Sequence, residues 1–183
     1  MARINLAQIN ANEFALTYNW KLDAVIPNTI PGITAGDYGG ETQILNLSCI
    51  SSDLPKSSIK SISQNIRGIQ TIQSGGQLSD QHITLVFAER RDWKVSKLFE
   101  LWRQYIFSMA DGTGNSKAAY ITDDFKLRLL TEKDGDTLQQ QATYSLRYAY
   151  PEQVSYEQLG ADPGSIAKTT VVMAFATHTI TYP

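Results

Sequence analysis

Residues 57–76 read SSIKSISQNIRGIQTIQSGG, and this stretch decides how the rest of the chain is interpreted. Its isoleucines are spaced by three or four residues, at 59, 62, 66, 69 and 72, which predicts an amphipathic helix. The same stretch is rich in Ser and Gln, and β-branched isoleucine is a modest helix former. That composition favours a hairpin with strands near 57–63 and 68–74 and a turn at 64–67. Propensity supports the two interpretations about equally.

The segments that precede this stretch are predicted to be strands separated by a loop. Residues 14–25 alternate with period two, which is typical of a half-buried strand. Its inward face is predicted to carry Phe14, Leu16, Tyr18, Trp20, Leu22 and Ala24. Residues 27–41 hold two prolines and four glycines, so we expect a loop there. Residues 44–50 read ILNLSCI and predict a strand with Leu45, Leu47 and Cys49 facing the core.

A strand and the main helix are predicted to follow. Residues 82–88 (HITLVFA) indicate a strand, and a helix is predicted from Asp92 to Met109. Asp92 is the expected N-cap, and Asp111-Gly112 is the expected end. The predicted apolar stripe of this helix consists of Leu98, Leu101, Trp102, Tyr105, Ile106 and Met109.

The remainder of the chain predicts further strands. Residues 118–131 form one strand or two with a kink at Asp123-Asp124, and Asp134-Gly135-Asp136 is a strong hairpin turn. The return strand runs over 138–150 and is stopped by Pro151, and 166–182 is a long last strand. One helix among many antiparallel strands predicts an α+β, mainly β, sandwich or barrel, which we expect to be one domain over 1–183.

Composition excludes several classes of function. The chain has 183 residues and a formal net charge of −2, whereas a dedicated nucleic-acid binder needs a basic surface. A lone cysteine, Cys49, excludes an internal disulfide framework. No run of 18 apolar residues and no apolar leader segment are seen, so we expect neither membrane insertion nor a signal peptide.

The sequence offers no convincing catalytic, cofactor or metal site. His82 and His178 are interpreted as solvated strand residues, and no GxSxG nucleophile motif is present. The acidic pairs Asp123-Asp124 and Asp134/Asp136 stand where turns favour aspartate. We therefore expect no enzyme activity and no cofactor.

The order of these features resembles the inner tail-tube proteins of contractile bacteriophages. The resemblance extends from about residue 12 to the end and departs in the long 27–41 loop and an extended N-terminal arm, 1–11. It is carried, together with 57–76, by LNLSCISSDLP (45–55), HITLVFAERRDWKVSKLFELWRQY (82–105), LRYAYPEQVSYEQLGADPGSI (146–166) and TTVVMAFATHTI (169–180).

The resemblance implies that residues 56–76 are a projecting β-hairpin that reaches a neighbouring ring. The inter-subunit contacts would then be made by Ile59, Ile62, Ile66, Arg67, Ile69 and Ile72, with help from the N-terminal arm. A hairpin in an isolated subunit would expose these isoleucines to water, which is a liability unless a partner covers them. That physical argument for assembly is independent of the resemblance, although a buried helix would hide them too.

The family further implies rings, usually hexameric, that stack head to tail around a lumen through which duplex DNA passes without specific binding. Such a lumen should be polar and neutral or acidic, and the residues expected to line it are Gln139, Gln141, Thr143 and Ser145. Implied partners are further copies of the chain, the tail sheath on the helix side, and baseplate and terminator proteins. The location would be the virion tail, assembled in the host bacterial cytoplasm.

Three alternatives remain. The chain could be a tube initiator in a baseplate or a tube terminator, which share the tube domain but form a single ring. It could be the inner tube of a headless injection particle. Or it could be a small β-barrel binding module or hydrolase with a similar strand order, which would need a pocket with converging polar groups.

Overall fold

A computed structural model of the chain describes residues 19–33, 41–133, 137–157 and 166–183. The described part is mainly β, with antiparallel pairing throughout, so the α+β expectation is confirmed. The elements are β1 (Trp20–Ala24), α2 (Glu41–Ser48), β2 (Cys49–Ser52), β3 (Ser57–Ile66), β4 (Ile69–Ser79), β5 (His82–Ala88), α3 (Lys94–Ile106), β6 (Phe107–Ser108), β7 (Thr113–Gly114), α4 (Lys117–Tyr120), β8 (Phe125–Lys133), β9 (Thr137–Arg147), β10 (Tyr150–Tyr156), β11 (Lys168–Ala174) and β12 (Thr177–Thr181).

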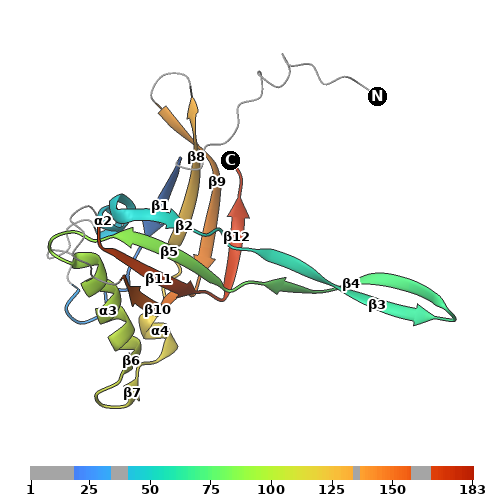
Figure 1. Ribbon diagram of the computed structural model, residues 1–183, viewed down its shortest axis with the longest axis horizontal. Helices are drawn as coiled ribbons and strands as arrows, with labels where there is room; N and C mark the ends of the chain where they lie inside the picture. Colours follow the sequence, from blue (N-terminus) through green and yellow to red (C-terminus); the bar gives the residue numbers. More distant parts are fainter. Residues whose placement is uncertain (1–18, 34–40, 134–136, 158–165) are drawn as a thin grey trace.

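Two four-stranded sheets enclose the core. Sheet A has the order β1-β8-β9-β12, sheet B has the order β10-β11-β5-β2, and their strands cross at a steep angle (Figure 1). Sheet A contributes Leu22, Phe125, Leu127 and Leu146 to the core, and sheet B contributes Leu85, Phe87, Val171 and Met173, among others. Helix α3 closes one end of this core: the ring of Phe99 lies 5.3 Å from that of Phe87, and Trp102 is 1% exposed.

Two predicted strands are each divided between the sheets. The return strand, expected over 138–150, ends as β9 at Arg147, and the chain enters β10 of sheet B after Tyr148, whose φ is +57°. Pro151 lies inside β10, an edge strand, where a missing N–H is tolerated. The last strand, expected over 166–182, is broken between Ala174 and Thr177, because the chain moves there from β11 in sheet B to β12 in sheet A.

The strand predicted over 44–50 is wrong for most of its length. Residues 41–48 form helix α2, which packs on β1, and only Cys49 onward is strand. Leu45 is buried whereas Leu47 is 81% exposed, so the predicted inward alternation does not hold. The helix places the side-chain oxygen of Asn46 at 2.9 Å from the backbone N–H of Leu22, which donates to it. This long-range contact is invisible to a local pattern.

The main helix is shorter than predicted and starts differently. It spans Lys94–Ile106, and Met109 lies beyond it with 79% of its surface exposed, outside the apolar stripe. Trp93 occupies the N-cap position with φ +51°, and its side chain makes no capping hydrogen bond within the described part of the chain. The backbone N–H of Ser96 instead donates to the Glu89 carboxylate at 2.8 Å, so Asp92 is not the cap.

Other sequence expectations are met in part. The strand over 82–88 is confirmed as β5, and the alternation of Trp20, Leu22 and Ala24 is confirmed in β1, whereas the rest of that predicted strand, 14–18, lies outside the described residues. The region 118–131 is not two strands but helix α4 followed by β8. The turn at 134–136 also lies outside the described residues, although Lys133 and Thr137 on either side of it pair in β8 and β9.

Candidate assembly interface

Residues 57–76, for which helix and hairpin were equally favoured by propensity, form a two-stranded hairpin. Strands β3 and β4 pair only with each other among the described strands and project from the body (Figure 1). The turn is Arg67-Gly68, both with positive φ (+51° and +82°), which is the geometry of a two-residue primed turn. The five isoleucines are 46–72% exposed. The hairpin interpretation is therefore confirmed, with longer strands and a later turn than the residue pattern indicated.

The isoleucines lie on both faces of the hairpin. Ile62 pairs with Gln73 and Ile66 with Ile69, so Ile62, Ile66 and Ile69 share one face, because paired residues point to the same side. Ile72 pairs with Ser63 and therefore points to the other side. Ile59 belongs to that second side by its place in β3. A single flat partner cannot cover all five side chains.

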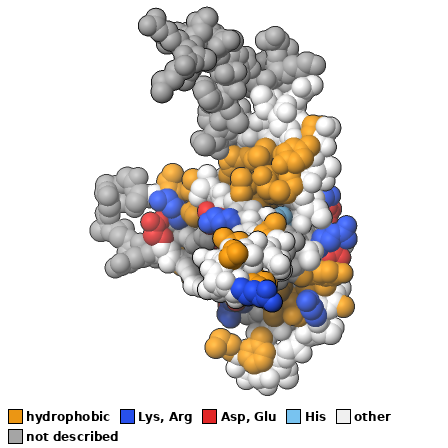
Figure 2. Space-filling model, turned by 90° about the vertical axis from the view of Figure 1, so that its right-hand side faces the viewer, with side chains coloured by type: hydrophobic (Ala, Val, Ile, Leu, Met, Phe, Trp, Pro, Cys, Tyr) orange, Lys and Arg blue, Asp and Glu red, His pale blue; other side chains and the backbone are white. Residues whose placement is uncertain are grey.

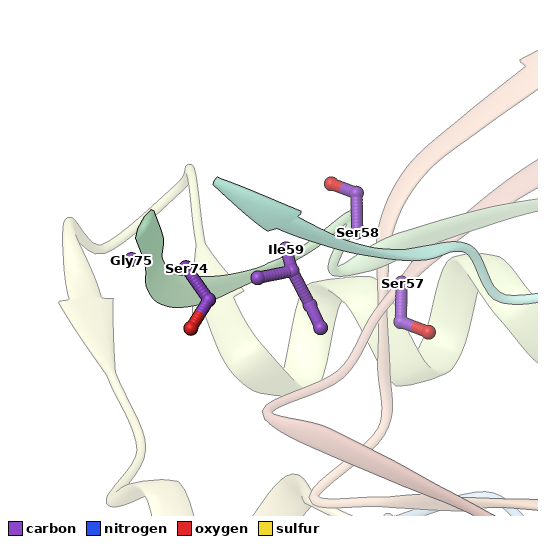
Figure 3. A pocket seen from close by; sticks show the side chains of 5 residues that line it. All are labelled: Ser57, Ser58, Ile59, Ser74 and Gly75. Atoms are coloured by element: carbon purple, nitrogen blue, oxygen red, sulfur yellow. The ribbon is translucent and has the colours of Figure 1, made fainter. Parts of the chain in front are cut away.

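A bulge near the base divides the hairpin. Ile59 pairs with Gln77 and Ser61 pairs with Ser74, so Gly75 and Gly76 together oppose Lys60. A Cβ on Gly75 would lie 2.7 Å from the backbone oxygen of Lys60, closer than real contacts allow. The bulge lies beside a shallow hollow lined by Ser57, Ser58, Ile59, Ser74 and Gly75 (Figure 3). Because the lining consists of small polar groups and one isoleucine, the hollow has no converging catalytic groups.

Charge is segregated between the hairpin and the rest of the chain. Residues 56–79 contain Lys56, Lys60 and Arg67 and no Asp or Glu. Since the whole chain has 16 basic and 18 acidic residues, the remainder has 13 and 18, a formal charge of −5. The hairpin is therefore both apolar and basic, and the rest of the chain is acidic.

Sheet A carries the four residues expected to line a lumen, but it does not present them together. Thr143 pairs with Arg128 and Ser145 with Lys126, on the face directed away from the core, although Thr143 is only 8% exposed. The pairing shifts between Leu129 and Leu130, so that Gln141 has no direct partner and Gln139 pairs with Thr131, on the opposite side from Thr143. Gln140 takes the place next to Thr143 and Ser145 on the outward face.

The outward face of sheet A is polar and carries ion pairs. Nε of Arg128 lies 2.6 Å from Oδ2 of Asp23, a charge contact without hydrogen-bond geometry, and Nζ of Lys21 lies 3.3 Å from Oδ1 of Asp23. Lys126 pairs with Asp124. Threonines of β12 continue this face: Thr179 pairs with Ser145 and Thr181 with Thr143.

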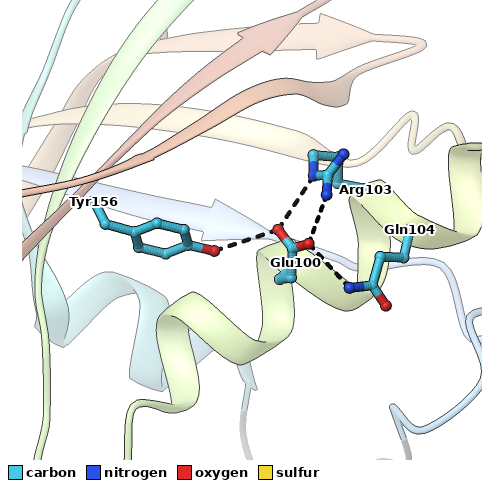
Figure 4. Close-up of polar contacts among 4 residues, drawn as sticks. All are labelled: Glu100, Arg103, Gln104 and Tyr156. Atoms are coloured by element: carbon cyan, nitrogen blue, oxygen red, sulfur yellow. Dashed lines mark hydrogen bonds and ion pairs between the residues drawn. The ribbon is translucent and has the colours of Figure 1, made fainter. Parts of the chain in front are cut away.

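A polar cluster ties the exposed side of α3 to sheet B. The Glu100 carboxylate accepts hydrogen bonds from Arg103 at 2.6 and 3.1 Å, from Gln104 at 2.9 Å and from the Tyr156 hydroxyl at 3.3 Å (Figure 4). These contacts, the Arg103 bond foremost, hold the pKa of Glu100 below its ordinary value. The cluster fixes β10 against the helix.

Among the described residues, the surroundings of the two histidines show no catalytic arrangement. Nε2 of His82 lies 2.8 Å from Glu152 at the surface, and the His178 ring makes an edge contact with Phe175 at 5.8 Å between centroids. Within the described ranges, no three His, Cys, Asp or Glu side chains are grouped so that they could hold a metal ion. In the same ranges no helix has the length and apolar character needed to cross a membrane.

Comparison with known proteins identifies the family. The family model described as "Phage tail tube protein" matches residues 11–181. The chain belongs to the phage tail tube protein family. A search of curated proteins finds no match to this tail tube chain.

Several solved structures contain chains with a fold similar to that of this tail tube protein. One similar chain is from the cryo-EM structure of the PVC sheath/tube terminator of an extracellular contractile injection system in the extended state (TM-score 0.61, 15% identity, 93% of this chain and 99% of that chain). Another is from the anti-feeding prophage baseplate (0.62, 10%, 93% and 97%). A third is from the PVC sheath-tube complex (0.60, 14%, 99% and 100%). At such low identity these likenesses show the fold.

Residue patterns missed three features of this surface. The bulge at Gly75-Gly76 could have been suspected from adjacent glycines inside a strand. The charge segregation is readable from the sequence, because no acidic residue interrupts 56–79. The division of the isoleucines between two faces required the observed register.

Proposed function

We propose that this chain is a structural subunit of a contractile-type tail tube, without enzyme activity. The observation that carries the proposal is the projecting hairpin with five exposed isoleucines on two faces. Complete burial of an isoleucine contributes roughly 1.5–3 kcal/mol, and these five are 46–72% exposed. Covering the hairpin by a partner would therefore contribute about 5–9 kcal/mol. That is comparable with the cost of association, on the order of 4–15 kcal/mol, and favours a cooperative assembly of many contacts.

The hairpin would contact another copy of the same chain. Its charge of +3 complements the −5 of the remaining residues. A contact between a hairpin and a different surface on the next copy is heterologous, and repeated heterologous contacts generate rings or open stacks. Rings, which we take as hexameric, would stack through the hairpins and the N-terminal arm, 1–11.

The channel would be formed by sheet A. In the described part of the chain, β1 and β12 are its edge strands, each paired on one side only. Pairing of these edges between neighbours would join the sheets into a continuous barrel and leave no free lateral edge. The outward face of sheet A would then line the lumen for duplex DNA. Ser145 and Gln140 lie on this face, with the largely buried Thr143 between them, whereas Gln139 lies on the opposite side.

The remaining surfaces would contact other tail components. The exposed side of α3 would face the sheath, and the ends of the tube would contact baseplate and terminator proteins. The location would be the virion tail, assembled in the host bacterial cytoplasm. Support comes from the family match and from similar folds in structures titled sheath-tube complex, baseplate and terminator.

A second candidate is a tube terminator or a tube initiator in a baseplate. It is supported by the TM-scores, which are as high for the terminator (0.61) and baseplate (0.62) chains as for the sheath-tube chain (0.60). A headless injection particle would use the same tube fold. Copy number per particle separates these roles, because a tube subunit is present in many rings and a terminator in one.

Electron microscopy of the concentrated protein tests the proposal. The parent protein should form rings or tubes, and Ile62→Asp or Ile69→Asp should abolish them without unfolding the subunit, because a buried charge on the hairpin has no partner. Lys97→Asp, on an exposed position of α3, serves as the matched control and should still assemble. Persistent parent monomers, or tubes formed by both hairpin variants, would contradict the proposed function.

A further inference from the structure

The core-facing side of sheet A continues beyond the core as an apolar surface. Along β9, Leu146 is fully buried whereas Tyr144, two residues earlier, is only partly buried. Along β12, Ile180 is 40% exposed, and Tyr182, just after the strand, is 69% exposed. Ile180 pairs directly with Tyr144, so the side chains lie together on one face. We call Tyr144, Ile180 and Tyr182 the platform.

Among the described residues, no strand or helix covers sheet A at the platform. In Figure 1, β8, β9 and β12 extend past the strands of sheet B at the end of the molecule where the chain terminates. Figure 2, viewed from the side on which the hairpin projects, shows hydrophobic side chains gathered on this side of the body. A sheet face of this kind is normally buried against a second layer of strands or helices.

The hairpin formed by β3 and β4 is a two-stranded layer that packs on no apolar surface of its own subunit among the described residues. It has two strands, and such a ribbon is marginally stable in water unless it packs on another apolar surface. Within its own chain it does not cover the platform, because its isoleucines and Ile180 are all at least 40% exposed. The hairpin and the platform can therefore cover each other only if they belong to different copies of the chain. Charge agrees, because the basic hairpin would approach an otherwise acidic chain.

We propose that the hairpin face with Ile62, Ile66 and Ile69 of one copy packs on the platform of a second copy. This face carries three of the five isoleucines, and the other carries two. The inference rests on the proposed tube function and adds the receiving surface. In this contact, β3 and β4 of one copy cover the part of sheet A that sheet B of the second copy leaves open. The two-layer packing of one subunit is thus extended by strands of its neighbour.

Cysteine cross-linking tests the contact. Ile69→Cys and Ile180→Cys are purified separately, mixed under assembly conditions and oxidised. A disulfide-linked dimer that contains one of each variant is expected. Two controls use the opposite faces: Ile72→Cys with Ile180→Cys, and Ile69→Cys with Thr181→Cys, should each link at least tenfold less. The parent, with Cys49 alone, gives the background. No mixed dimer, or equal linking by the controls, would overturn the inference.

A charged substitution on β12 tests it by a different route. Ile180→Asp should raise the critical concentration for assembly at least tenfold in sedimentation, whereas Lys97→Asp, at an exposed position of α3, should leave it within threefold. Circular dichroism and thermal unfolding confirm that both monomers fold. If Ile180→Asp assembles like the parent while the parent forms tubes, the platform is wrong and the tube function stands. If the parent forms no assembly, the proposed function is wrong and this inference falls with it.

Discussion

Glu89 connects three separate elements through one carboxylate. Its Oε1 accepts from the backbone N–H of Ser96 at 2.8 Å, from the Thr169 hydroxyl at 2.7 Å and from the Ser96 hydroxyl. Glu89 follows β5, Ser96 lies in the first turn of α3 and Thr169 lies in β11. The negative charge is also favourable at a helix start. Residue 89 therefore does the capping that a local pattern assigns to Asp92.

Glu89→Ala should lower the free energy of unfolding by about 1–3 kcal/mol, because it removes the cap and the shared acceptor of the Ser96 and Thr169 hydroxyls, which lie 2.9 Å apart and would keep only each other. Urea unfolding followed by circular dichroism measures the change. Asp92→Ala is the matched control and should change stability much less, since Asp92 lies at the surface and its ion pair with the partly exposed Lys94 contributes little. Equal losses for the two variants would show that Glu89 does not hold the helix start.

Cys49 should be chemically inert in the folded protein. Burial raises the pKa of its thiol to about 12 from the ordinary 9.0, and Sγ donates a weak hydrogen bond to the Ser51 carbonyl oxygen. Alkylation at pH 8 should therefore be roughly a thousandfold slower than in denaturant, because the thiolate reacts. The raised pKa also means that this contribution to stability is present below pH 9 and is lost as the pH rises toward 12. Similar alkylation rates in both states would contradict the burial.

At the scale of the element, the bulge sets the shape of the hairpin. Gly75→Ala would place a Cβ at 2.7 Å from the Lys60 oxygen, so the strands must separate locally, whereas an added Cβ at Gly76 would meet no described atom within 4 Å. Gly75→Ala should reduce assembly at least tenfold with unchanged thermal unfolding of the body, and Gly76→Ala should assemble nearly normally. Electron microscopy and sedimentation compare them. Equal assembly by the two variants would mean that the bulge is not needed.

Local sequence patterns predicted some of the helices and strands and failed for others. β5 was predictable to the residue because its buried face alternates over seven residues. The stretch 57–76 was not, because isoleucine spacing fits a helix and β-branching fits strands. Helix α2 was missed because a run of seven residues cannot separate the two periods. What makes it helical is contact with β1, to which Asn46 is hydrogen-bonded.

At the scale of the whole molecule, the opposite charges of hairpin and remainder should make assembly depend on salt. Arg67→Glu should raise the critical concentration about two- to fivefold at low salt, because an exposed ion pair contributes up to about 1 kcal/mol. The difference from the parent should vanish near 0.5 M salt, where charges are screened. Sedimentation measures both, with Lys97→Glu as the control. An effect of Arg67→Glu that persists at high salt would indicate a steric cause instead.

Local sequence was sufficient for the mainly β class, the single long helix, the absence of a recognisable catalytic motif and the regular spacing of the five isoleucines. These properties depend on side-chain type and on spacing within a dozen residues. The division of two long strands between sheets, the face on which each isoleucine lies, the separation of Gln139 from Thr143 and the uncovered platform depend on register and on where sheet B ends. They follow from pairing between strands far apart in the chain, where a shift of one residue reverses every side chain.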